Sequence, residues 1–131
     1  MQTILRCAAV VLTVASVPAS AGNDSSRVVL DMAAEATALS EFCVNWAIDS
    51  VAVRRFLRSR GVSVEGRYRP VFGAAYARAH EKVWRSGNYP AACDNALDLY
   101  GPQGRQVSDL VRPVWNGACA DCVRPETLVG Y

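Results

Sequence analysis

Apolar and small side chains recur along the first half of the chain at steps of three and four, the spacing of one helix face. They fall at Val28, Val29, Met32, Ala36, Leu39, Cys43, Trp46, Ser50, Val53 and Leu57. The opposite face carries the charged side chains Asp31, Glu35, Glu41, Asp49, Arg55 and Arg58. The pattern predicts a helix that begins near residues 23–25 and ends at Gly61. Because such a helix exceeds the usual length, we expect a break at residues 37–40.

Two shorter helices are predicted farther along the chain. Residues 70–87 begin with a proline, end with a glycine and repeat apolar side chains at helical spacing. Residues 88–100 show the same spacing and stop before Gly101-Pro102. Residues 107–111 are expected to add one or two helical turns, and residues 113–131 to form an irregular C-terminal tail. Since no alternating pattern exceeds four residues, the predicted fold class is all-α, a small bundle of three to five helices.

The first 21 residues have the features of a secretory signal peptide. One positive side chain, Arg6, precedes an apolar run from Cys7 to Val17, and the segment ends in the small-residue sequence Ala19-Ser20-Ala21. The alternative is a buried N-terminal helix. The run is too short to span a bilayer, and no later stretch is long enough. We therefore expect cleavage near Ala21, a single helical domain at 22–131, and a periplasmic or secreted location.

Composition narrows the class of protein further. Of the 131 residues, 51% are hydrophobic, which excludes a disordered chain, and a formal charge of +2 gives no reason to expect nucleic acid as a partner. Apart from Lys82, every basic residue after the predicted cleavage site is arginine, a bias typical of GC-rich bacterial genomes. These features indicate a small exported bacterial protein.

Four cysteines remain after the predicted cleavage, and an even number in a short exported chain indicates disulfides. We favour the pair Cys43–Cys93, since both residues fall on apolar faces of predicted helices, together with Cys119–Cys122. The CxxC at 119–122 has a second interpretation as a redox-active dithiol, although nothing resembling a strand precedes it. Zinc binding would need a second ligand pair, and haem attachment would need a histidine where Val123 stands. We predict no metal and no cofactor.

Arginine and tryptophan supply the candidate binding residues. Six arginines lie within sixteen residues, opposed there only by Glu65, and suit an anionic ligand or partner. They are Arg54, Arg55, Arg58, Arg60, Arg67 and Arg69. The alternative is a solvated helix end, where cations complement the helix dipole. Trp84 lies off the apolar face of its helix and Trp115 lies in the tail, so either is a candidate interface anchor or a packing residue.

No catalytic pattern stands out in the chain. The one histidine, His80, is expected to be structural or solvated, and no G-x-S-x-G elbow accompanies it. Asp94 and Asp98 stand four residues apart on one predicted helix, but an exposed carboxylate pair seldom binds a metal ion. We therefore predict that the protein is not an enzyme.

Two cysteine-bearing segments resemble those of a known family. The sequences EFCVNWA (41–47) and ACDNALDLY (92–100) resemble the cysteine-bearing helices of periplasmic immunity proteins, which neutralise peptidoglycan amidases delivered by type VI secretion. The spacing of the two cysteines is also similar to that of small periplasmic acid-stress chaperones. The terminal CxxC and the distance from Cys93 to 97–100 depart from these patterns, so no functional residue is transferred.

The resemblance implies a small interaction protein, an inhibitor or immunity-type binder of another protein. Two alternatives stay open. One is a thiol-redox protein that uses the C-terminal CxxC, and the other is a binder of a small anionic ligand at the arginine-rich end.

Overall fold

A computed structural model describes residues 21–114 of the chain. The predicted signal segment up to residue 20 lies outside this range, as do Trp115, Cys119 and Cys122, so those assignments stay predictions. The elements, in chain order, are α1 Ala21–Ser40, β1 Trp46–Ile48, α2 Ser50–Ser59, the 3₁₀ turn η1 Gly66–Tyr68, α3 Arg69–Ser86, α4 Tyr89–Tyr100 and β2 Val111–Pro113.

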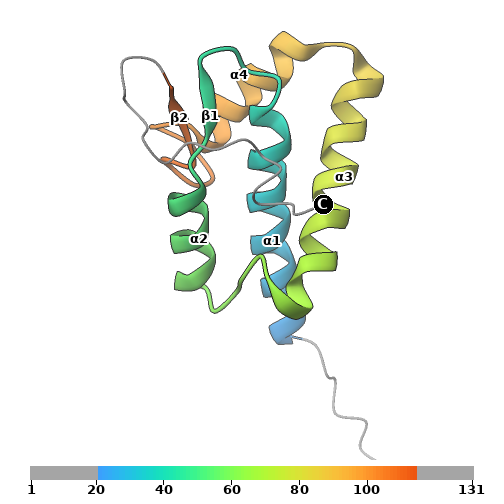
Figure 1. The fold of residues 1–131 in the computed structure, drawn as a ribbon, viewed down its shortest axis with the longest axis vertical. Coiled ribbons are helices and arrows are strands. Elements are labelled where there is room, and N and C mark those ends of the chain that lie inside the picture. Colours follow the sequence, from blue (N-terminus) through green and yellow to red (C-terminus); the bar gives the residue numbers. More distant parts are fainter. Residues whose placement is uncertain (1–20, 115–131) are drawn as a thin grey trace, which may run out of the picture.

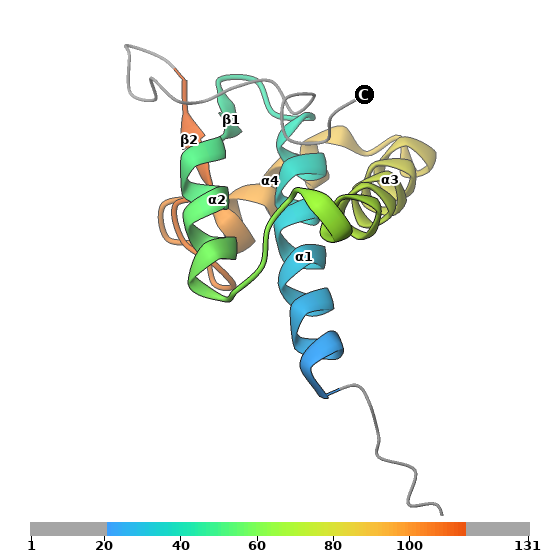
Figure 2. The ribbon, with the colours of Figure 1, turned by 60° about the horizontal axis from the view of Figure 1, so that its bottom comes forward.

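Helix α1 is the centre of the fold. It runs between α2 and α3, with α4 packed behind it, and both views show this arrangement (Figures 1 and 2). Its second half carries small residues on several sides, and Ala33, Ala34, Ala36 and Ala38 are fully buried. A helix that is apolar around most of its circumference is expected at the centre of a core. The described residues contain no helix long and apolar enough to cross a membrane.

The long N-terminal helix predicted from the spacing is divided in two. Helix α1 ends at Ser40, at the edge of the predicted break, and the chain then forms a loop and strand β1 before α2 begins. Asp49 starts α2, because its carboxylate accepts hydrogen bonds from the backbone N–H of Val51 and Ala52, both at 3.0 Å. Consequently Cys43 and Trp46 lie outside any helix, contrary to the prediction.

A two-stranded antiparallel sheet also corrects the all-α prediction. Strand β1 pairs with β2, with Ile48 opposite Val111 and Trp46 opposite Pro113. Residues 107–111 therefore do not form the predicted helical turns but lead through turns and bends into β2. Strands of three residues are too short to produce a detectable alternation. The fold is mainly helical, with four α-helices and this small sheet among the described residues.

The two later helices, α3 and α4, agree with the prediction. Gly87 adopts a left-handed φ of 64° at the end of α3, a conformation that favours glycine. Asn88 then caps α4 by accepting the N–H of Ala91 at 3.3 Å. This tight connection turns the chain so that the start of α4 lies against the end of α3 (Figure 1).

Candidate functional site

A disulfide joins the loop after α1 to α4. Cys43 and Cys93 are bonded, with their Cα atoms 4.9 Å apart, which confirms the first predicted pair. The predicted pair Cys119–Cys122 lies outside the described residues, so the structure describes one disulfide and not two. The Cys43–Cys93 bond fixes the loop that carries Phe42 against the helix that carries Tyr89.

Beside the disulfide lies a group of stacked rings, which we call the aromatic surface: Phe42, His80, Trp84 and Tyr89. The Phe42 ring centroid is 5.1 Å from that of Tyr89 and 5.2 Å from that of His80. Tyr89 in turn stacks on Trp84, with centroids 6.0 Å apart. Trp84 is 61% exposed and Tyr89 36% exposed. Trp84 was a predicted site residue, and the structure places it at the exposed end of this stack.

The carboxylate of Glu41 contacts His80 of the aromatic surface and the nearby Tyr76. Glu41 accepts a hydrogen bond from the hydroxyl of Tyr76, and its Oε2 lies 3.2 Å from Nε2 of His80. Tyr76 and His80 are one turn apart on α3, so one carboxylate holds two side chains of the same helix. The His80 side chain remains 35% exposed. This arrangement fixes the orientation of an imidazole at the protein surface.

The six predicted arginines do not form a single cluster. Arg54 and Arg58, one turn apart on α2, line a pocket of about 190 Å³ with residues 62–65. The other four are exposed and lie elsewhere: the guanidinium of Arg60 lies over the ring of Phe56, Arg67 donates a 2.8 Å hydrogen bond to the hydroxyl of Tyr68, and Arg55 and Arg69 do not line this pocket. Of the six arginines, the structure therefore places Arg54 and Arg58 at one pocket, which Glu65 also lines.

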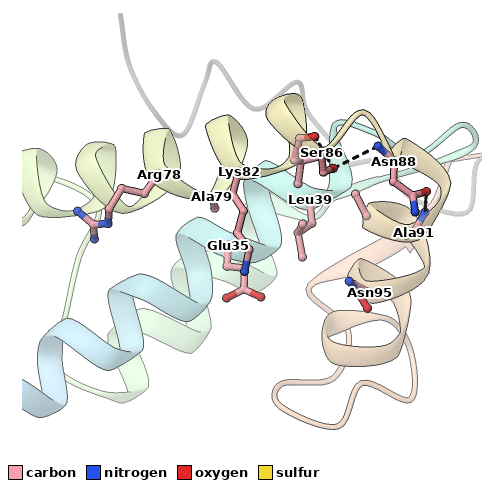
Figure 3. A pocket seen from close by; sticks show the side chains of 11 residues that line it. Glu35, Leu39, Arg78, Ala79, Lys82, Ser86, Asn88, Ala91 and Asn95 are labelled. Carbon is pink, nitrogen blue, oxygen red and sulfur yellow. Dashed lines mark hydrogen bonds between the residues drawn. The ribbon is translucent and has the colours of Figure 1, made fainter.

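A larger pocket of about 440 Å³ opens between α1, α3 and α4 (Figure 3). Its polar lining includes Glu35 from α1, Lys82 from α3 and Asn95 from α4. Burial raises the pKa of the Glu35 carboxyl group, and the positive charge of Lys82 partly offsets this rise. Sequence analysis missed this pocket, because three separate helices supply its polar groups and no local motif marks them.

One carboxylate of the pair on α4 is engaged in an ion pair. Arg105 binds the carboxylate of Asp98 through two nitrogen atoms, and this hydrogen bonding lowers the pKa of Asp98. Residues 21–114 contain no group of three or more His, Cys, Asp and Glu residues that could hold a metal ion. Asp98 is therefore half of a surface ion pair with Arg105.

Comparison with known proteins adds no assignment. No family model matches the chain, and neither the curated proteins nor the solved structures contain a significant match. The function must therefore be inferred from the chain's own residues.

Proposed function

We propose that the protein is a small exported binding protein, an inhibitor or immunity-type partner of another protein, and that the aromatic surface makes the contact. The observation that carries this proposal is the 61% exposure of Trp84 at the end of a stack of rings. Tryptophan and tyrosine, with arginine, are enriched among the residues that dominate binding energy at protein interfaces.

The rigidity of the surface supports the same role. Phe42 lies next to the Cys43–Cys93 bond, and His80 is held by Glu41. Side chains that are already ordered lose less conformational entropy when a partner binds, so more of the contact energy appears as affinity. The exported location and the immunity-type role rest on the predicted signal segment and on the resemblance of residues 41–47 and 92–100.

Capture of a partner from a periplasmic extract tests the proposal. The oxidised chain, Trp84→Ala and the control Val28→Ala are each immobilised, since Val28 is an exposed apolar residue of α1 outside the aromatic surface. We expect wild type and V28A to retain the same protein and W84A to lose it. Equal retention by W84A would exclude the aromatic surface as the contact. Repeated absence of any retained protein above background would end the proposal.

A second candidate is binding of a small anion at the arginine-rich end. Arg54 and Arg58, which line one pocket from consecutive turns of α2, favour it, because guanidinium groups suit phosphate or carboxylate oxygens. Inorganic phosphate should then raise the melting temperature of wild type and of Arg55→Gln, a control on the same helix outside the pocket. The rise should disappear in Arg58→Gln, and an unchanged rise in R58Q would exclude this candidate.

The thiol-redox alternative depends on Cys119 and Cys122. Titration of free thiols in the native protein, together with a disulfide-exchange assay, separates it from the binding proposal. A redox protein should show a reducible, exchanging pair at these positions. A fully oxidised and inert pair would exclude the alternative.

A further inference from the structure

The 440 Å³ pocket lies on the other flank of α3 from the aromatic surface. His80 and Trp84 belong to one flank of this helix, whereas Lys82 and Ser86, each two residues farther along, line the pocket. Its volume falls within the roughly 300–1,000 Å³ typical of small-molecule sites. The pocket is therefore available for a ligand of its own, independent of a protein bound at the aromatic surface.

Glu35 gives the pocket a carboxylate without a direct partner. The hydrogen bonds and ion pairs found among residues 21–114 do not include this side chain. Burial is the main cause of its raised pKa, so water is partly excluded from the carboxylate. A partly desolvated carboxylate without a hydrogen-bond donor favours a ligand that brings one.

Lys82 supplies the opposite charge from the facing helix. In Figure 3 the Lys82 side chain extends from α3 toward Glu35 on α1, and its charge acts on the Glu35 carboxyl group. Yet the two groups form no ion pair within 4.0 Å, although both are among the described residues. The pocket thus presents a negative and a positive group that are close enough to interact but not in contact.

The remaining lining fits a small, partly apolar molecule. Leu39, Val83, Ala91 and Ala92 supply apolar wall, and Asn95 adds an amide from α4. Arg78 lies at the α3 side of the pocket and pairs weakly, at 3.5 Å, with Asp31. In Figure 3 the Arg78 side chain points away from Lys82 and Glu35, so Lys82 is the cation that a ligand carboxylate meets in the pocket.

From this arrangement we propose that the pocket binds a small zwitterion that carries an ammonium group and a carboxylate, as free amino acids and short peptides do. The ammonium group donates to Glu35 and the ligand carboxylate accepts from Lys82. The positive end of such a ligand then lies at Glu35 and its negative end at Lys82. Each of the two side chains gains an opposite charge, and the ligand adds no net charge to the pocket. The proposal does not depend on the function proposed for the aromatic surface.

Isothermal titration of the oxidised chain tests the ligand class with four probes. Alanine and alanyl-alanine carry both charged groups, whereas N-acetyl-alanyl-alanine lacks the ammonium group and alanyl-alanine amide lacks the carboxylate. At least one zwitterionic probe should bind, and both blocked peptides should bind at least about tenfold more weakly, as loss of a charge-assisted hydrogen bond predicts. Preference for alanine or for the dipeptide identifies the source as an amino acid or a peptide.

Variants assign the binding to this pocket. Glu35→Gln and Lys82→Met should each raise the dissociation constant about tenfold. Glu81→Gln is the matched control, because Glu81 is a carboxylate of α3 that pairs with Arg85 outside the pocket. Absence of binding by both zwitterions, equal binding of either blocked peptide, or unchanged binding in E35Q would each overturn the proposal. Trp84→Ala should bind the probes normally, which separates this result from the test of the aromatic surface.

Discussion

Nε2 of His80 lies 3.2 Å from Oε2 of Glu41, so a contact between an imidazole and a carboxylate joins α3 to the loop that follows α1. The same carboxylate accepts a hydrogen bond from the hydroxyl of Tyr76, one turn earlier on α3. Glu41 precedes Phe42, and the Phe42 ring packs on that of His80. The Glu41 carboxylate therefore positions His80, which belongs to the aromatic surface, and Tyr76, which lies one turn away on the same helix.

Removal of this carboxylate should destabilise the fold through Tyr76. We expect Glu41→Ala to lower the free energy of unfolding by about 1–2 kcal/mol, because the hydroxyl of a buried tyrosine loses an acceptor. Urea denaturation of E41A, Tyr76→Phe and the double variant measures the coupling between the two residues. E41A should cost less in the Y76F background than in wild type. Equal costs in both backgrounds would show that the two side chains do not interact.

The Cys43–Cys93 bond should contribute a large part of the stability. It closes a sequence separation of 50 residues, for which the chain-entropy account predicts about 4 kcal/mol. We expect the double variant Cys43→Ser/Cys93→Ser to have a much lower urea midpoint than the oxidised protein. Reduction of wild type should give the same lowering, whereas the reductant should not change the double variant further, provided that Cys119–Cys122 staples only a local turn. Similar midpoints for oxidised protein and double variant would contradict this prediction.

Local signals were sufficient for α3 and α4. A proline near each start, a glycine after each end and regular apolar spacing predicted both helices, and Gly87 and Gly101 end them as expected. The spacing also placed Trp84 off the apolar face, and the structure confirms that it is exposed. These features depend on neighbours in sequence, which sequence analysis can read.

Tertiary contacts determined what sequence analysis missed. Helical spacing continues through residues 41–48, but Asp49 caps a new helix and Val111 pairs with Ile48, so the segment becomes loop and strand. The aromatic surface combines rings from α3, from α4 and from the loop after α1, which the disulfide and Glu41 hold in place. Glu35 and Lys82 face one pocket because α1 and α3 pack side by side. Apart from the Asp49 cap, which is a local signal, these relations leave no pattern within one stretch of sequence.

Glu35 should reduce stability at neutral pH. Its folded-state pKa lies above the ordinary value of 4.5, mainly because of burial, so the folded protein holds this proton more tightly than the unfolded chain does. Stability from this group is therefore greatest below pH 4.5 and decreases as the pH rises through the folded-state pKa. Glu35→Gln should raise the urea midpoint at pH 7 and lose most of that advantage at pH 3.5.

The control for Glu35 is Glu81→Gln, a carboxylate of α3 in a surface ion pair with Arg85. E81Q should lower stability at pH 7 by a few tenths of a kcal/mol at most, as expected for exposed pairs at this spacing. A lower urea midpoint for E35Q at pH 7 would mean that Glu35 stabilises the fold as a charged group, contrary to the prediction.

Removal of the Tyr100 hydroxyl should also stabilise the fold. The side chain is fully buried on the face of α4 toward the core, and its oxygen has no hydrogen-bond partner within the described part of the chain. Burial, with a smaller contribution from the charge of Glu35, raises the pKa of this hydroxyl, so it stays protonated at neutral pH.

A buried donor without an acceptor costs about 1–3 kcal/mol. Tyr100→Phe keeps the ring and should therefore raise the free energy of unfolding by about 1 kcal/mol. Tyr89→Phe, which removes the hydroxyl of a residue that is 36% exposed, should change the free energy of unfolding by less than about 0.5 kcal/mol. Urea denaturation of both variants measures the difference, and a loss of stability in Y100F would show that the hydroxyl is satisfied in solution.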